Sequence, residues 1–402
     1  MVSPNGVGTG AFADACLNGR SGLVRPAGDE FQSLKTSAVA AVEEFDPLTV
    51  MPAAEARRVP RMIPMAIAAS REAMRQAGIE IDPANLAVQR SIGVALGTGG
   101  GGLAFVEEQY RQLFTGGQPS LFSITAGTHG NLSSELSICL QLRGPSHVLS
   151  TGCTSSTDAL GYATTLIRTG AVPMMLAGGA DAPISPGILH AFEKMRVVST
   201  RRWDDPRQSS RPFSADRDGF VLGEGAWMFI LESLDHARSR GAHPVAEVLG
   251  YASTCDAFHR VQIAPDVAEP VRAIELALRD AAIERHEIEY VNLHGTGTAL
   301  NDRMETLAMH RSLGAHAMRV PMSSTKSMIG HPQGACGAAG LAATVLCLQR
   351  GGVHPTINLD SPDDDCDLDY VANEARPSAA RVALCNCIAF GSKNSAMLIR
   401  VL

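Results

Sequence analysis

The sequence predicts an α/β fold, and three observations support this class. Short apolar segments of strand length alternate with longer segments whose apolar residues recur at helical spacing. The 402 residues include 39 glycines, and only 5% of the residues are aromatic. Small residues let helices pack closely on a sheet, so this composition fits alternating layers. Because 45% of the residues are hydrophobic, the chain can also fill a sizeable core.

The predicted elements alternate along the whole chain. The expected strands are 147–150, 172–177, 227–232, 245–251, 290–294, 321–325 and 382–389. The expected helices are 64–76, 103–114, 154–169, 267–282, 302–313 and 334–349. The same alternation occurs on either side of a junction near 235–245. We therefore predict two related α/β units, residues 1–238 and 239–402, that pack as one body.

Composition excludes several classes of protein. No uninterrupted apolar stretch is long enough for a membrane span, and the first residues lack the pattern of a signal peptide. The nine cysteines are scattered and lack the paired spacings of a metal site, so we expect free thiols in a reducing, cytoplasmic compartment and no metal. A net charge of −7 gives no general signal for nucleic-acid binding.

The first functional motif is Pro-Ser-His-Val-Leu-Ser-Thr-Gly-Cys-Thr-Ser-Ser-Thr, residues 145–157. A short strand runs into Cys153, and apolar residues at helical spacing follow as far as Gly170. Cys153 is therefore expected on a tight turn at the N-terminus of a helix. Unpaired N–H groups and the helix dipole favour a thiolate there, which is the form that attacks a thioester. A random cysteine of this chain would be a core residue, but the companions of Cys153 favour a nucleophile.

Two further motifs carry histidines at the ends of strands. Tyr-Val-Asn-Leu-His-Gly-Thr-Gly-Thr, residues 290–298, delivers His294 into a loop, and Asp302 and Glu305 follow as members of its expected hydrogen-bond network. The segment 323–337 places Lys326 and His331 in a second turn between a strand and a helix. A lone histidine is usually structural. Together with Cys153, however, two imidazoles and one cation supply what a thioester condensation needs.

These motifs and the segment Arg-Pro-Phe-Ser-Ala-Asp-Arg-Asp-Gly-Phe-Val-Leu-Gly-Glu-Gly-Ala, residues 211–226, resemble those of the elongating β-ketoacyl-ACP synthases of bacterial fatty-acid and polyketide pathways. The resemblance covers nearly the whole chain in order. It implies a five-layered αβαβα thiolase fold built from two related halves. It also implies a decarboxylative Claisen condensation without a cofactor, with substrates carried on the phosphopantetheine of acyl-carrier protein. The implied assembly is a homodimer, or a heterodimer with a chain-length-factor subunit.

The resemblance also assigns roles to residues. Cys153 would carry the acyl chain, and His294 and His331 would drive decarboxylation of the malonyl thioester. Lys326 would order the hydrogen bonds around His331. The backbone N–H groups of Cys153 and Phe390 would form the oxyanion hole, with Phe390 in a gating loop that also contains Ala389 and Gly391.

The chain departs from the family pattern at several positions. Ala389 and Ser392 replace gating-loop glycines, which predicts a stiffer loop. Gly340 stands where fatty-acid enzymes often have a glutamate and modular polyketide synthases tend to have glycine, so we favour polyketide-like chemistry. Gly100 stands where an isoleucine often narrows the acyl pocket, so we expect a roomy pocket. The start at Met1 falls inside a family motif, which predicts a misplaced start codon or a missing sheet strand.

Four arginines are candidates for docking of the acidic carrier protein and its phosphate: Arg57, Arg58, Arg61 and Arg196. A solvated basic face is the simpler interpretation.

Three alternative functions remain open at this stage. A thiolase shares Gly-His-Pro-x-Gly-x-x-Gly (330–337), but Cys385 and Cys387 lack the glycines that flank its second cysteine. A chain-length-factor-like partner subunit would do no chemistry and typically lacks the cysteine. A starter-unit enzyme commonly pairs the cysteine with His and Asn rather than with two histidines.

Overall fold

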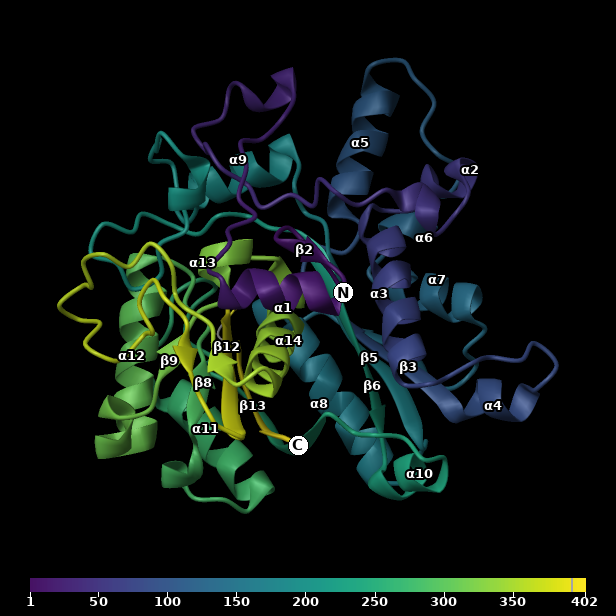
Figure 1. Ribbon diagram of the computed structural model, residues 1–402. Helices are drawn as coiled ribbons and strands as arrows, with labels where there is room; N and C mark the ends of the chain where they lie inside the picture. The colour runs from purple at the N-terminus through teal and green to yellow at the C-terminus, as the bar shows by residue number, and fades with distance from the viewer. Residues whose placement is uncertain (392) are drawn as a thin grey trace.

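A computed structural model describes residues 1–391 and 393–402, and it contains two main sheets (Figure 1). The first has the strand order β2 (Gly6–Val7), β1 (Val2–Ser3), β6 (Gly225–Glu232), β5 (Met174–Asp181), β3 (Ile92–Gly97) and β4 (Ser146–Leu149). The second has the order β7 (Ala246–Cys255), β13 (Lys393–Val401), β12 (Val382–Ala389), β8 (Tyr290–Asn292) and β9 (Met322–Ser323). A small sheet joins β10 (Gly352–Val353) to β11 (Arg376–Pro377).

The two sheets share one pattern of strand directions. In the first sheet, β1 is antiparallel to β6, β6 is antiparallel to β5, and β5, β3 and β4 are parallel. In the second, β7 is antiparallel to β13, β13 is antiparallel to β12, and β12, β8 and β9 are parallel. Five strands of one half therefore correspond to five strands of the other, as the prediction of two related halves requires.

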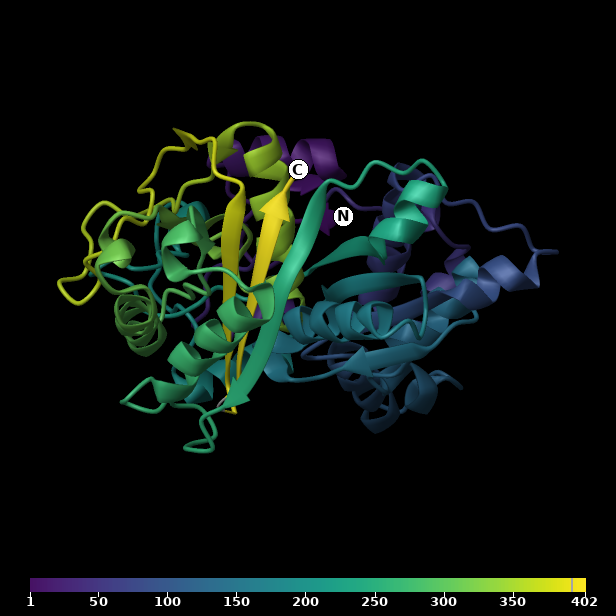
Figure 2. The same ribbon diagram turned by 90° about the horizontal axis from the view of Figure 1, so that it is seen from below.

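Helices complete a five-layered αβαβα arrangement (Figures 1 and 2). The central layer contains α8 (Ser155–Arg168) and α14 (Cys336–Gln349), whose side chains share one core with residues of both sheets. The outer layer of the first half contains α3 (Met62–Gln76) and α7 (Asn131–Leu140), and that of the second contains α11 (Ala268–Ala281) and α12 (Ala299–Leu313). The predicted thiolase-type α/β fold is confirmed.

The remaining helices surround these layers. They are α1 (Thr9–Leu17), α2 (Ala53–Ala56), α4 (Leu86–Ser91), α5 (Leu103–Phe114), α6 (Ser123–Gly127), α9 (Pro186–Met195), α10 (Leu234–Ser239) and α13 (Lys326–Ile329). In Figure 1, α2, α5, α6 and α9 lie above the layers, away from α10. The predicted division at residues 238 and 239 falls inside α10 and stays a prediction. Near the start of the chain, β1 is paired on both sides, with β2 and with β6.

The central layer positions the functional motifs. In the first half the chain leaves β4 and enters α8; in the second half it leaves β9, passes α13 and enters α14. Cys153 precedes α8 and His331 precedes α14, so the two residues occupy corresponding places in the two halves. The fold therefore brings together two motifs that are 178 residues apart in the sequence.

Candidate active site

Cys153 lies on a tight turn between β4 and α8. Gly152 has a φ of 74°, a conformation that favours glycine, and a side chain built there would meet Ala389 Cβ at 3.3 Å. A single 3-10 turn, Gly152–Thr154, leads into α8. The hydroxyl of Thr154 donates to Asp158, which also accepts a hydrogen bond from Tyr251 at 2.8 Å. The turn thus holds the Cys153 sulfur at the N-terminus of a central helix, and Cys153 is only 5% exposed.

His331 faces this sulfur from the second half. Its Nε2 lies 3.1 Å from Cys153 Sγ, and its backbone N–H donates to Val221 at 2.7 Å. Burial alone would lower the pKa of His331, but the negative charge of the Cys153 sulfur, with a contribution from Cys336, outweighs burial and raises the pKa to about 9. Among the described residues, Nδ1 of His331 has no hydrogen-bond partner. The charge of His331 therefore depends on the charge of Cys153.

His294 lies beside His331 but has a different environment. The two rings are nearly perpendicular, with centroids 5.3 Å apart. The ligand nitrogens of both histidines and Cys153 Sγ lie within 4.8 Å of one another. Burial, and then the positive charge of Lys326, lower the pKa of His294 to about 3. His294 is therefore a neutral imidazole at physiological pH.

Two buried carboxylates fix the loop that carries His294. Glu305 accepts the backbone N–H groups of His294 and Gly295, each at 2.7 Å, and the side-chain amide of Asn386 at 2.6 Å. Asp302 accepts the N–H groups of Thr296 and Gly297. Burial raises the pKa of Glu305 to about 7, although these N–H donors oppose the shift, and burial likewise raises the pKa of Asp302. The predicted network residues thus act on the backbone of the loop.

Lys326 differs from the expectation. Its ammonium donates to the backbone carbonyl of His294 at 2.6 Å, so its contact is with His294 rather than with hydrogen bonds around His331. Its side chain is buried, and no carboxylate of the described residues forms an ion pair with it. At Gly340, where a glutamate was considered, a Cβ would come within 2.4 Å of Asn292 Oδ1. A carboxylate on α14 at this position would therefore require the Asn292 side chain to move.

The chain after β12 passes close to the turn of Cys153. A side chain at Gly152 would approach the carbonyl oxygen of Phe390 to 3.4 Å as well as Ala389. Gly391 has a φ of 84° and donates to the carbonyl of Arg260 at 2.9 Å. Ser392 lies outside the described residues. The position of Phe390 beside Cys153 agrees with the expected oxyanion hole, which stays a prediction.

A cavity of about 300 Å³ opens onto the reactive groups. Cys153, His294, His331, Ala389 and Phe390 line it, together with apolar residues that include Ile263 and Ile388. Gly100 is buried and donates its N–H to Asp181 at 3.0 Å, but it is not part of this lining, so its effect on chain length stays a prediction.

The four candidate docking arginines separate into three groups. Arg196 is exposed and lines the cavity that contains Cys153. Arg61 instead binds the buried carboxylate of Glu224 at 3.0 Å, which ties it to the fold. Arg57 and Arg58 are exposed, and Arg58 pairs with Glu55 and covers the ring of Phe122. Arg196 is therefore the candidate that the structure brings to the site.

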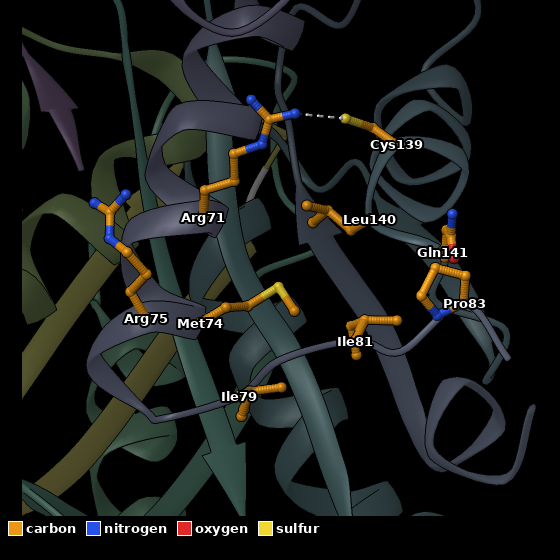
Figure 3. A pocket seen from close by; sticks show the side chains of 9 residues that line it. All are labelled: Arg71, Met74, Arg75, Ile79, Ile81, Pro83, Cys139, Leu140 and Gln141. Carbon is orange, nitrogen blue, oxygen red and sulfur yellow. Dashed lines mark hydrogen bonds between the residues drawn. The ribbon is translucent and has the colours of Figure 1, made fainter. Parts of the chain in front are cut away.

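A second hollow, of about 390 Å³, shares no lining residue with this cavity (Figure 3). It lies between α3 and the end of α7, where a guanidinium N–H of Arg71 contacts Cys139 Sγ at 3.5 Å. None of the predicted site residues takes part in it.

Sequence reasoning missed two cysteines at the site. The Sγ atoms of Cys336 and Cys387 both contact the backbone carbonyl of Cys153, at 3.2 and 3.1 Å, and lie 3.7 Å from each other. Cys387 Sγ is also 3.5 Å from Nδ1 of His294. Cys336 lies within the motif at 323–337, but no spacing rule connects it to Cys387, because the contact is made only by the fold.

Comparison with known proteins defines the class of this protein. Residues 1–237 match the family "Beta-ketoacyl synthase, N-terminal domain", and residues 245–360 match "Beta-ketoacyl synthase, C-terminal domain". The chain belongs to the β-ketoacyl synthase family, whose members are acyltransferases.

Relatives come from both polyketide and fatty-acid synthesis. The tetracenomycin polyketide synthase ketoacyl synthase alpha subunit of Streptomyces glaucescens is 40% identical, covering 99% of this chain and 94% of the relative. The 3-oxoacyl-[acyl-carrier-protein] synthase 2 of Synechocystis sp. is also 40% identical, covering 88% of this chain and 84% of the relative.

Two solved structures have the same fold. One is a ketosynthase bound to the hexaketide, in complex with its type II polyketide synthase acyl-carrier protein; it has a TM-score of 0.91 and 32% identity. The other is the ishigamide ketosynthase/chain length factor, with a TM-score of 0.91 and 30% identity. Each alignment covers 100% of this chain and 97% of the other. Within the described residues, no helix combines the length and apolar character needed to cross a bilayer.

Proposed function

We propose that this protein carries an acyl chain as a thioester on Cys153 and condenses it with a malonyl unit delivered by acyl-carrier protein. The observation that carries this proposal is the convergence of Cys153 Sγ, His294 and His331 within 4.8 Å beside an apolar cavity. Nucleophile and imidazoles come from different halves of the chain, and all three are buried. No cofactor is required, because loss of carbon dioxide supplies the driving force.

In the first step, the Cys153 thiolate attacks the acyl thioester of the carrier. A new carbon–sulfur bond forms, the carbon–sulfur bond to pantetheine breaks, and His331 gives its proton to the pantetheine thiolate, which leaves as the thiol. The negative charge on Cys153 disappears, and with it the largest of the interactions that raise the pKa of His331. Acylation therefore converts His331 from an imidazolium to a neutral imidazole.

In the second step, the malonyl thioester loses carbon dioxide, and its carbonyl oxygen acquires negative charge. The N–H groups of His294 and His331 donate to this enolate oxygen. The enolate carbon attacks the acyl carbonyl on Cys153, whose oxygen is met by the N–H groups of Cys153 and Phe390. The carbon–sulfur bond breaks, and the Cys153 thiolate is restored.

The pathway we propose is of the polyketide type. Gly340 supports a polyketide-type pathway. A Cβ atom at this position of α14 would lie 2.4 Å from Asn292 Oδ1, so the packing favours glycine there. Relatives that are 40% identical are named for polyketide synthesis and for 3-oxoacyl-carrier-protein synthesis. The acyl group that Cys153 accepts is therefore the direct test of the pathway. The nine cysteines, all free, support a location in the reducing cytoplasm.

The partners we propose are acyl-carrier protein and a second ketosynthase-like subunit, either a copy of this chain or a chain-length factor. Arg196, exposed at the cavity, is suited to the phosphate of the carrier's prosthetic group. For the second subunit, β4 is an edge strand of the first sheet. Exposed apolar side chains on α5, on α6 and between them also suit a covered surface: Leu103, Tyr110, Leu113, Phe114, Leu121, Phe122 and Ile124.

Intact-mass spectrometry tests the proposal. After incubation with a panel of acyl-carrier thioesters, the wild-type chain gains one acyl group, and Cys153→Ala gains none. With malonyl-carrier added, the acyl group leaves as a β-ketoacyl product, whereas acetyl-carrier gives no product. Equal acylation of Cys153→Ala, or condensation with acetyl-carrier alone, contradicts the proposal. Cys139→Ala, which removes an exposed cysteine, is the matched control.

A further inference from the structure

Beneath the reactive groups lies a second cluster of soft ligands. Cys336 begins α14, Cys387 lies in β12, and His294 follows β8, so three separate segments supply it. The two sulfurs and one imidazole nitrogen lie within 4.8 Å of one another, and all three residues are buried. The condensation described above uses neither sulfur.

Two of the three distances within this cluster are close to those of a tetrahedral zinc site. With Zn–S near 2.3 Å and Zn–N near 2.0–2.1 Å, tetrahedral angles place two sulfurs about 3.8 Å apart and a sulfur and a nitrogen about 3.6 Å apart. The structure has 3.7 Å between Cys336 and Cys387, and 3.5 Å between Cys387 Sγ and His294 Nδ1. The third distance, from Cys336 Sγ to the imidazole of His294, is within 4.8 Å.

We propose that Cys336, Cys387 and His294 Nδ1 form a binding site for a soft divalent cation such as Zn²⁺. Both sulfurs, which now contact the carbonyl of Cys153, bind the ion as thiolates, so any thiol proton they hold is released when the ion binds. Two thiolates neutralise the two charges of the ion, so no net charge is buried. Two thiolates and an imidazole are ligands that zinc prefers over harder cations.

The second triad that shares His294, formed with Cys153 and His331, is the weaker candidate. It offers only one sulfur, so a divalent ion there would keep a net positive charge in a buried site. Binding at Nδ1 instead leaves the proton of His294 on Nε2. The ion would also join the loop after β8, the start of α14 and β12, so it would stabilise the fold.

Titration of the purified full-length protein with Zn²⁺, in a non-thiol reductant and against a chromophoric chelator, tests this site. The wild type is expected to bind one equivalent, release at least one proton and melt at a higher temperature. Cys336→Ser and Cys387→Ser are expected to bind at least about 100-fold more weakly. Cys385→Ser, two residues along the same strand, and Cys153→Ser are the controls and are expected to bind as the wild type does.

The proposal is overturned if the wild type does not bind the ion, or if Cys336→Ser/Cys387→Ser binds it as tightly as the wild type does. Loss of binding in Cys153→Ser with retention in that double variant would also overturn it, by assigning the ion to the other triad. Binding of Co²⁺ to the wild type tests the ligand assignment without any variant. Its absorption spectrum shows tetrahedral geometry and thiolate charge transfer if the assignment is right, and lacks both if it is wrong. None of these measurements depends on condensing activity.

Discussion

His294 and His331 serve one reaction centre, but they are held in opposite ways. The His294 loop is fixed by buried Glu305 and by the Lys326 ammonium, and its imidazole is neutral. The ring of His331 contacts the Cys153 sulfur at 3.1 Å, and the negative charge of that sulfur, with a contribution from Cys336, raises the pKa of His331. One histidine is positioned by the scaffold, whereas the other responds to the state of the nucleophile.

The largest effect is expected from removing either imidazole ring. His294→Ala and His331→Ala are each expected to reduce condensation by about 10²- to 10⁴-fold, because each removes a donor to the enolate. Only His331→Ala is expected to slow the acylation of Cys153 as well, because His331 alone contacts the sulfur at 3.1 Å. Rapid-quench mass spectrometry separates the two steps. Equal acylation rates in the two variants would contradict the assigned difference.

Glu305→Gln tests whether the buried carboxylate that fixes the His294 loop is needed for the condensation step. The amide keeps the shape of the side chain but replaces one of its two acceptor oxygens with an N–H group, so one backbone N–H of the His294 loop loses its acceptor. We expect kcat to fall about 10- to 100-fold, with KM and the acylation of Cys153 little changed. Glu275→Gln, on the exposed face of α11, is the control. A matching loss of acylation would mean that Glu305 supports the whole site rather than His294.

Acid should destabilise the protein partly through His294. Its pKa is about 3 when folded and near 6.5 when unfolded, so the unfolded chain binds an extra proton between those values. The free energy of unfolding therefore falls as the pH falls from about 6.5 to 3, by at most about 1.4 kcal/mol per pH unit from this residue. His294→Asn removes this contribution.

Urea unfolding at pH 6.5 and pH 5 measures the effect. His294→Asn is expected to lose less stability between these pH values than the wild type does, whereas the exposed His190→Asn should follow the wild type. An equal loss in all three proteins would show that His294 titrates normally in the folded state.

The sequence predicted those helices and strands whose apolar residues recur with a clear local periodicity. The predicted strands 172–177 and 382–389 and the predicted helices 64–76 and 334–349 have clear periodicity, and the structure confirms them as β5, β12, α3 and α14. Strands β3 and β13 were missed. β3 is six buried residues ending in a glycine run, and β13 has almost no exposed face, so neither alternates as a half-buried strand does.

The same distinction between local patterns and long-range contacts applies to the active site. Cys153, His294 and His331 stand in motifs whose strand-to-loop context is local. The contact of Lys326 with the His294 carbonyl and the approach of Cys336 to Cys387 are made between distant segments, so no spacing contains them.

Nuclear magnetic resonance of ¹⁵N-labelled histidines tests the account most directly, with His294→Asn and His331→Asn used to assign the signals. At pH 7.5 we expect His294 to be neutral and His331 to be an imidazolium. After acylation of Cys153 with a short acyl thioester, His331 should become neutral while His294 stays as it was. The same protonation state for both histidines, or a His331 signal that does not change on acylation, would contradict the claim that the charge of Cys153 controls the charge of His331.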